Sequence, residues 1–573
     1  MEVFLKLRLT LTCLPDKGLG VLDSQPFLFF QLSRSMINFS ITRLTSFLPV
    51  ILLLTTACST TLTKEKDTKR PPNILIIMAD DMGYSDIGSY GSEISTPNLD
   101  LLAKNGLRFR NFYNAARCCP TRASLLTGLY PHEAGMGGMV SSVKSTPATG
   151  PYQGYLNENC VTMAEVLGQA GYQTYMSGKW HVGEKPEHWP RKRGFQKYFG
   201  LISGASSYYE IIREQSAVRQ MVLDDQLWDP PKEGFYMTDA ITDQAVEYLK
   251  EHHSSTPSKP FFMYMAYTAP HWPLHALPED VRKYEGVYSK GWDELRQSRF
   301  ARMKELGILD KTYVLSSRDA DVPAWEEVDN KAEWERKMTV YAAMIDRMDQ
   351  GIGRVIQELK ATNEWDNTLI FFLSDNGGCA ENVAGRKLNN PAVAIGDKGS
   401  YVAYDEPWAN ASNTPFRKYK QWTFQGGIAT PFIAHWPRGI KNKGAIRPEV
   451  GHITDLMKTC LDVAGATYPT EYKGNSLLPL RGESLLPVFK GESAGKERTL
   501  YWEHFGSEAI RKGDWKLVTG KANSNWELYN LAQDPVEEHD LSSRYPEKVQ
   551  ELKQMYSTWA AEVGVKPTSG SRE

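Results

Sequence analysis

Residues Asn73–Met78 read NILIIM, and Ala79, Asp80 and Asp81 follow them directly. An apolar run of this kind is typical of a β-strand buried on both faces, as in the parallel sheets of α/β proteins. Because ligands bind at the carboxyl ends of strands in open α/β sheets, the two aspartates also mark the position of a site. An aspartate pair after one strand is equally compatible with a turn or a helix cap.

The same apolar pattern recurs along the chain and alternates with helical periodicity. Further strands are predicted at Leu107–Tyr113, Tyr172–Met176, Phe261–Tyr267, Thr368–Leu373 and Thr430–His435. Helices are predicted at Leu99–Asn105, Pro120–Thr127, Met163–Ala170 and Lys337–Leu359. This alternation predicts an α/β domain with a large, mostly parallel sheet flanked by helices.

The pattern changes near Lys496, where short strands with turns replace the α/β alternation. These strands are predicted at Thr499–His504, Ala509–Arg511, Trp515–Thr519 and Trp526–Tyr529, before a helix at Glu547–Val563. We therefore expect a catalytic domain at 71–495 and a smaller α+β domain with an antiparallel sheet at 496–563. The segment 278–330 is expected to be a cap-like insertion beside the site.

Polar clusters follow four of the predicted strands. They are Asp80-Asp81, Lys179 with His181, His271, and Asp375-Asn376. Carboxyl ends of parallel strands meet at one edge of a sheet, so these clusters are expected to form a single site.

The N-terminal region contains a targeting signal. Residues 40–57 read SITRLTSFLPVILLLTTA, with Arg43 before an apolar run that is too short for a comfortable transmembrane helix. The signal peptide is placed at 36–57, because Met36 precedes a normal short n-region. Residues 1–35 are then an upstream extension from a mis-assigned start. A buried core helix is the alternative, and the polar tail that follows argues against it.

The end of this signal resembles a bacterial lipobox, in which Cys58 is lipidated and becomes the new N-terminus. Thr55 stands where leucine is usual, so cleavage by an ordinary signal peptidase is the alternative. Residues 58–70 are expected to form a linker. The protein is then exported to the periplasm or the outer cell surface, and membrane contact is limited to this lipid.

Composition excludes some classes of function. The 573 residues carry a formal net charge of -2, with acidic and basic residues mixed, so nucleic acid is not an expected partner. Apart from Cys13 and Cys58, five of the seven cysteines remain, an odd number with no disulfide or zinc spacing. A disulfide between the adjacent Cys118 and Cys119 would need a strained ring. This pair indicates chemistry instead.

Residues 118–128 read CCPTRASLLTG. The stretch resembles the signature of type I formylglycine-dependent sulfatases, arylsulfatase-like members of the alkaline phosphatase superfamily. The resemblance implies that a maturation enzyme oxidises Cys118, not Cys119, to Cα-formylglycine (3-oxoalanine), whose hydrate is the nucleophile. A helix beginning at Pro120 would direct free N–H groups and its positive dipole end toward that position.

The resemblance also implies a metal site. Asp80, Asp81, Asp375 and Asn376 match the family's metal ligands, and residue 118 adjoins them. Hard oxygen donors of this kind suit Ca²⁺ better than zinc, so one Ca²⁺ per chain is expected.

Further residues match the family's catalytic positions. Lys179 and Lys420 would hold the sulfate oxygens, and Arg122 would brace the hydrate. By the same resemblance, His181 would take a proton during sulfate release and His271 would protonate the leaving alcohol. Gln425 stands where the family has glutamate, which leaves Lys418 as an alternative to Lys420.

The expected activity is hydrolysis of sulfate esters, with a sulfated saccharide of extracellular glycans as substrate. The motivation for a sugar is a cluster of aromatic and polar residues near the mapped site: Tyr208, Tyr209, Trp272, His275, Trp502 and His504. The wider resemblance is to exported bacterial carbohydrate sulfatases. Two alternatives remain, a phosphonate or phosphate monoester hydrolase and an inactive sulfoglycan-binding lipoprotein.

Overall fold

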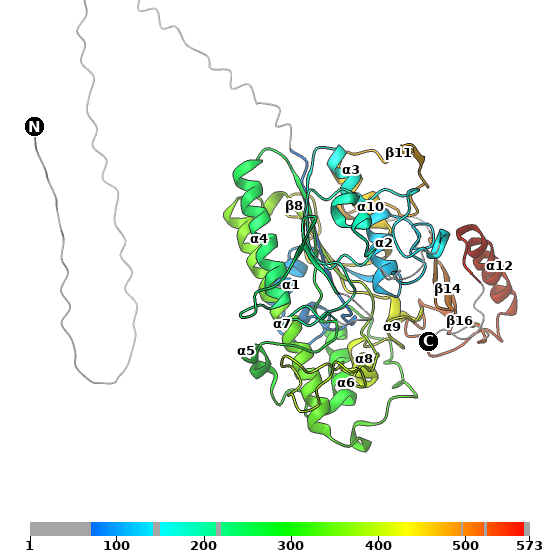
Figure 1. The fold of residues 1–573 in the computed structure, drawn as a ribbon. Helices are drawn as coiled ribbons and strands as arrows, with labels where there is room; N and C mark the ends of the chain where they lie inside the picture. The colour runs from blue at the N-terminus through cyan, green and yellow to red at the C-terminus, as the bar shows by residue number, and fades with distance from the viewer. Residues whose placement is uncertain (1–69, 141–148, 214–218, 494–496, 521–523, 567–573) are drawn as a thin grey trace, which may run out of the picture. The chain divides into compact units, whose positions relative to one another are not determined.

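The computed structural model describes residues 70–140, 149–213, 219–493, 497–520 and 524–566 (Figure 1). These ranges belong to one compact unit that begins at Thr68. The predicted signal peptide and Cys58 lie outside the described residues. Across the ranges given above, no helix combines the length and apolarity needed to span a membrane.

The described residues form a large sheet with the strand order β10-β2-β9-β8-β1-β7-β3-β4-β5-β6. Its strands are β1 (Asn73–Ala79), β2 (Leu107–Tyr113), β3 (Gln173–Gly178), β4 (Lys197–Leu201), β5 (Met221–Leu223), β6 (Gln226–Trp228), β7 (Phe261–Ala266), β8 (Thr368–Ser374), β9 (Phe432–His435) and β10 (Ile446–His452). The five central strands from β8 to β4 are parallel to one another, and β1 pairs with both β7 and β8. Antiparallel pairs occur on either side, at β9 and at β5–β6. The predicted parallel sheet is therefore confirmed at its centre, and the whole sheet is mixed.

Helices cover both faces of this sheet. They are α1 (Pro97–Lys104), α2 (Cys118–Thr127), α3 (Met163–Gln169), α4 (Met237–Ser255), α5 (Pro278–Val281), α6 (Gly291–Glu305), α7 (Lys331–Ala361), α8 (Asp405–Ser412), α9 (Gln425–Ile428), α10 (Asp455–Ala464) and α11 (Leu486–Phe489). Side chains alternate along β1, so Leu75 packs in a core with α1, α4 and α7, while Ile76 packs in a second core with α2, α3 and α10. Figure 1 shows α4 and α7 together on the first face.

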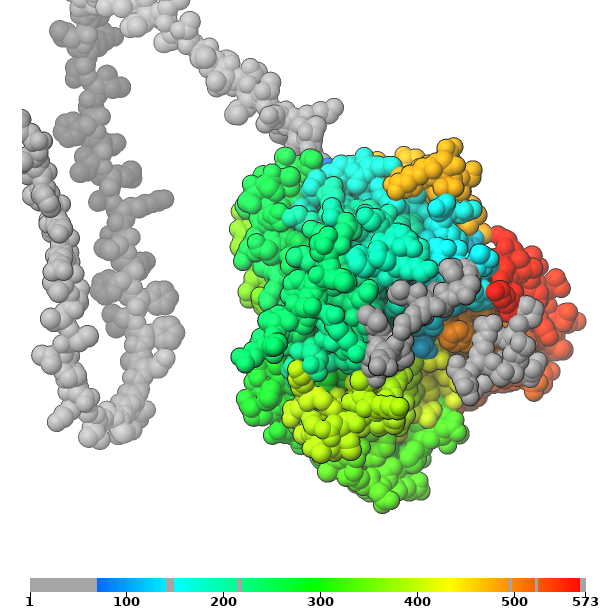
Figure 2. All heavy atoms as spheres, in the orientation of Figure 1, coloured from blue at the N-terminus to red at the C-terminus, as the bar shows by residue number. Residues whose placement is uncertain are grey.

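The C-terminal region forms a separate antiparallel sheet. Its strands follow one another as β13 (Thr499–His504), β14 (Ser507–Lys512), β15 (Trp515–Thr519) and β16 (Glu527–Asn530). Helix α12 (Pro546–Val563) packs on this sheet, with Leu552 against Ile510 and Leu517. In Figure 2 these orange and red residues are grouped on one side of the surface. The predicted C-terminal antiparallel sheet is confirmed.

The insertion 278–330 contains α5 and α6 and is tied to the loop after β1. The fully buried Arg299 on α6 donates to Asp86 at 2.5 Å and to Glu93 at 2.9 Å. Trp292, at the start of the same helix, packs edge-on against Trp408 of α8 with ring centroids 5.4 Å apart. These contacts fix the insertion to the catalytic sheet. Its role as a cap and the boundary at residue 495 stay predictions.

Candidate active site

The predicted clusters meet at the carboxyl edge of the central strands. Hydrogen bonds from Asp80 N to Ala269 O (3.0 Å), Asp375 N to Ala79 O (3.2 Å) and Lys179 N to Ala266 O (2.7 Å) extend the pairing just past the strand ends. The loops after β8, β1 and β3 therefore start at the same edge of the sheet, with β7 between β1 and β3. This is the arrangement that the strand-end positions predict.

Three carboxylates in this site are each paired with a cation. The pairs are Lys179 Nζ with Asp80 Oδ2 (2.6 Å), Lys420 Nζ with Asp81 Oδ2 (2.8 Å) and Arg122 Nη2 with Asp375 Oδ2 (2.7 Å). All six side chains are buried, so each pair is held in a low-dielectric environment. Burial opposes the ionisation of Asp81, but His271 and Lys420 outweigh it and hold the pKa of that carboxyl below its usual range.

Two oxygens of the predicted metal ligands accept no hydrogen bond from the described residues. Asp80 Oδ1 and Asn376 Oδ1 are buried and have no hydrogen-bond partner within the described ranges. Asn376 Nδ2 donates to Asp81 Oδ1 at 2.7 Å, which links the pair after β8 to the aspartate pair after β1. Buried oxygens without donors, beside carboxylates, are the donor set that a hard cation such as Ca²⁺ prefers. These residues therefore fit the predicted metal.

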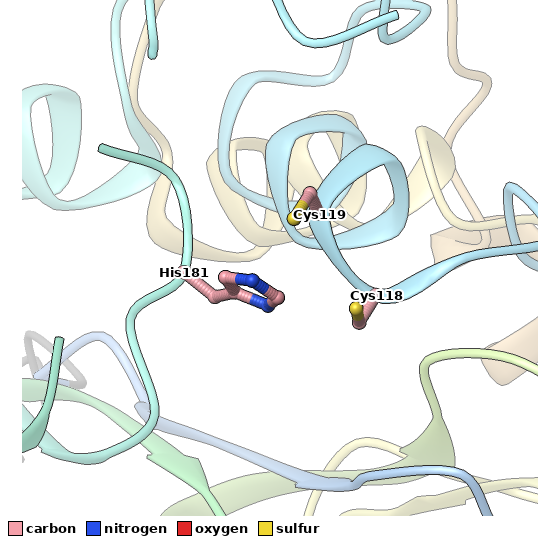
Figure 3. Close-up of side chains that lie close together, drawn as sticks. All are labelled: Cys118, Cys119 and His181. Atoms are coloured by element: carbon pink, nitrogen blue, oxygen red, sulfur yellow. The ribbon is translucent and has the colours of Figure 1, made fainter. Parts of the chain in front are cut away.

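Cys118 begins α2 beside His181, whose ring extends from its loop toward the start of the helix (Figure 3). A hydrogen bond with Cys119, together with the charge of Lys179, lowers the pKa of the Cys118 thiol well below its usual value. Burial lowers the pKa of His181 to about 4, and its Nδ1 has no partner among the residues described. His181 has a φ of 57°, so its ring is positioned by a left-handed backbone.

The orientation of His271 is fixed by its own neighbour. Its Nδ1 lies 2.6 Å from Trp272 O, and a carbonyl only accepts, so Nδ1 carries the proton. Nε2 then faces Asp81 Oδ2 and Lys420 Nζ, each 3.4 Å away. Burial lowers the pKa of His271 to about 3. The free nitrogen Nε2 is thus the one that faces the site.

Lys420 and Lys418 are the two alternatives for the second lysine that would hold sulfate oxygens, and the structure distinguishes them. Lys420 lies in the site, whereas Lys418 Nζ pairs with Asp319 at 2.8 Å, outside it. Arg122 reaches across the site and donates to Lys179 O at 3.0 Å as well as to Asp375.

Residues that strand-end reasoning missed surround this centre. Glu381 accepts hydrogen bonds from Arg117 (2.9 Å) and Trp272 (2.9 Å), and Lys420 lies 3.8 Å from the Cys379 thiol. Cys379 and Glu381 follow the glycine pair after Asn376, and Arg117 directly precedes Cys118. This closeness in sequence to predicted site residues is the signal that could have found them.

Some of the aromatic residues expected near a sugar have other roles. Tyr208 is buried and donates to His271 O at 3.0 Å, so it supports the loop that carries His271. His275 Nε2 contacts Ser400 O at 2.7 Å. These two residues are therefore structural parts of the site.

The fold and the site together define an α/β protein with a buried cluster of paired acidic and basic side chains at the carboxyl edge of its sheet. The model of the Sulfatase family matches residues 72–466, and that of the N-sulphoglucosamine sulphohydrolase C-terminal region matches 417–561. The chain therefore belongs to the sulfatase family, and it is a sulfatase that hydrolyses sulfate esters.

Relatives are similar in sequence to most of this chain. An uncharacterised sulfatase of Schizosaccharomyces pombe is 36% identical over 88% of this chain and 95% of its own length. An arylsulfatase of Klebsiella aerogenes is 36% identical over 73% of this chain and 92% of its own. Among solved structures, Ps i-CgsB in complex with k-i-k-neocarrahexaose is 28% identical with a TM-score of 0.63, covering 86% of this chain and 93% of that one.

Proposed function

We propose that this sulfatase removes sulfate from sugars of extracellular glycans, with residue 118 as formylglycine and one Ca²⁺ in the site. The observation that carries the proposal is the position of Cys118. It begins α2 next to His181, at the strand edge where Lys179 lies, so a nucleophile there would meet a sulfate held by cations. The free N–H groups at the start of α2 favour an anion at the same point.

Formylglycine at residue 118 would supply a hydrate with two hydroxyl groups, one to attack sulfur as the S–O bond to the alcohol breaks and one to allow release of sulfate by C–O cleavage. Lys179 and Lys420 bind the sulfate oxygens as point charges. His181 is neutral at physiological pH, because its pKa is about 4, and so accepts the proton that this C–O cleavage releases.

His271 would supply the proton of the leaving alcohol from Nε2, the nitrogen that faces Lys420, in its doubly protonated form. Burial favours the neutral ring by lowering the pKa of His271, so this form requires the negative charge of the bound sulfate ester beside it. Arg122 holds Asp375 and the loop of Lys179 in place. The oxygens of Asp80, Asp81, Asp375 and Asn376 would hold Ca²⁺, which supplies positive charge for the sulfate and the hydrate.

Two comparisons support a sugar substrate. A solved relative was crystallised with neocarrahexaose, and the C-terminal region matches that of N-sulphoglucosamine sulphohydrolase. We further propose that the sulfated unit lies at a glycan end, with galactose as the first candidate.

The proposal is tested by expressing the chain with a formylglycine-generating maturation enzyme. The tryptic peptide containing residue 118 should be about 18 Da lighter than its cysteine form. Released sulfate is then measured on sulfated monosaccharides, on nitrophenyl sulfate and on matched phosphate esters. Sulfate release from sugars supports the proposal, whereas turnover of phosphate esters alone, or an unmodified and inactive chain, would refute it.

We also propose that the protein is exported and anchored by lipid on Cys58. The support is the lipobox-like run that ends at this residue. Cell fractionation of the wild type and Cys58→Ser tests it: the wild type should be in the membrane fraction and the variant should not. A wild type found in the soluble fraction would refute the anchor.

A further inference from the structure

The turn between β13 and β14 lies against the segment that leads into Cys118. On one side, Trp502 Nε1 donates to Asn114 O at 2.8 Å. On the other, Thr423 N donates to Ser507 Oγ at 3.0 Å, close to the loop of Lys420. The C-terminal sheet is therefore fixed to two loops of the active site by this one hairpin.

His504 is the last residue of β13 and lies on the inner face of the hairpin. Side chains alternate along a strand, so His504 shares the face of Trp502, which packs on the catalytic sheet. The residue is 1% exposed, and neither ring nitrogen has a hydrogen-bond partner within the described residues. The tip of this hairpin is linked to the segment of Arg117, because Ser507 accepts from Thr423 N and the nearby Gln421 N donates to Ala116 O at 2.8 Å. Buried polar atoms are rarely left unpaired, so the two ring nitrogens of His504 need a partner.

Arg117 presents a third unused group in the same place. Its Nη2 donates to Glu381 Oε1, while its buried Nε has no partner across the described ranges. The Glu381 carboxylate is fully used, because Gln421 also donates to Oε1 (3.1 Å) and Trp272 to Oε2 (2.9 Å). The charge of Arg117 is thus already balanced, and what remains is a hydrogen-bond donor.

We propose that His504 and Arg117 form a recognition subsite for hydroxyl groups of the sugar ring that bears the scissile sulfate. The inference rests on the proposed function and assigns part of its specificity to the C-terminal domain. A neutral imidazole offers one donor and one acceptor, and a hydroxyl group likewise donates and accepts. A second acidic group is the weaker match, because the Glu381 carboxylate would repel it. His504 contacts substrate here and has no role in bond cleavage.

The first test compares His504→Phe with the wild type on a sulfated sugar and on nitrophenyl sulfate. Phenylalanine keeps the ring that packs 4.1 Å from Phe505 but removes both nitrogens. We expect kcat/KM on the sugar to fall about ten- to hundredfold, because sugar hydroxyls lose their partner. Nitrophenyl sulfate has no such hydroxyl, so its kcat/KM should stay within about twofold. His504→Gln, which restores a donor and an acceptor, should recover part of the loss.

His452→Phe is the matched control. His452 is a buried histidine of the same interface, its ring lies 5.8 Å from that of Trp502, and its Nε2 also lacks a partner within the described ranges. It contacts Thr454 rather than the segment before Cys118. This variant should leave the ratio of sugar to nitrophenyl sulfate activity unchanged.

Monodeoxy analogues of the sulfated sugar identify the hydroxyl. Removing the recognised hydroxyl should reduce kcat/KM in the wild type as much as His504→Phe does, and should add nothing in the variant. Equal losses of His504→Phe on sugar and nitrophenyl sulfate would overturn the subsite and leave the proposed function standing. If kcat/KM falls when a second sulfate or carboxylate is removed from the sugar, and not when a hydroxyl is removed, the hydroxyl assignment is wrong. A wild type that cleaves nitrophenyl sulfate but no sulfated sugar would refute both proposals.

Discussion

Asp375→Ala removes one carboxylate from the buried charge pairs at the strand ends. Asp375 Oδ2 accepts from Arg122 Nη2 at 2.7 Å and from Nε at 3.1 Å, and Oδ1 accepts from Asp81 N at 3.2 Å. Both side chains of the ion pair are fully buried, so alanine leaves the guanidinium with only its longer contact to Asp80 Oδ1, at 3.7 Å from Nη2. Breaking a buried pair in this way costs about 3–5 kcal/mol of the free energy of unfolding.

Urea unfolding in the presence of a chelator measures this cost without any contribution from metal. Asp375→Asn is the control, because the amide keeps an oxygen for Arg122 but loses the charge and the oxygen that accepts from Asp81 N, so its cost should be about 1–3 kcal/mol. Ca²⁺ at a hundred times its Kd should then stabilise the wild type by about 2.7 kcal/mol and both variants by less. Sulfatase activity should fall by orders of magnitude in both.

A loss below about 1 kcal/mol for Asp375→Ala in chelator would show that Arg122 does not depend on Asp375, contrary to the reasoning from burial. Stoichiometric zinc with no response to Ca²⁺ would refute the metal assignment.

Other variants test single roles. Cys118→Ala should abolish turnover with folding intact while Cys119→Ala costs little; the reverse result would show that the wrong cysteine is assigned. His271→Ala should slow alkyl and sugar sulfates by about a hundredfold to ten-thousandfold but nitrophenyl sulfate far less, and equal losses would exclude the acid role. Burial lowers the pKa of His452 to about 3, so its unfolded form binds a proton below about pH 6.5 and the folded form does not. The free energy of unfolding therefore decreases as pH falls. In His452→Asn its decrease between pH 7 and 5, measured by urea unfolding, should be smaller by about 2 kcal/mol than in the wild type. An unchanged decrease would contradict this reasoning.

The sheet was predictable where strands are uniformly apolar. β1, β7 and β8 are fully buried on both faces, so their hydrophobic runs are unambiguous. β10 reads IRPEVGH, with a proline and charges that an edge strand tolerates, and β5 and β6 have three residues each. Strands of this kind form because they pair with neighbouring strands, and their own sequences carry no clear strand pattern. Helix α4 was missed although its apolar residues, such as Ile241 and Leu249, recur with helical spacing.

The centre of the site was predictable because parallel strands align their carboxyl ends, which brings Asp80, Lys179 and Asp375 together from three loops. The surrounding residues follow no such rule. Glu381 lies in a loop beyond the strand end. Its position depends on tertiary packing, which periodicity does not encode.

The balance of charge among the three ion pairs has a consequence for binding order. Asp80, Asp81 and Asp375 formally cancel Lys179, Lys420 and Arg122. A bound Ca²⁺ would therefore leave an excess of two positive charges among buried side chains, and a sulfate monoester would offset part of it. Metal and anion then favour each other's binding, and the coupling is reciprocal. The apparent Kd for Ca²⁺ should fall when inorganic sulfate is present, and the affinity for sulfate should rise with Ca²⁺.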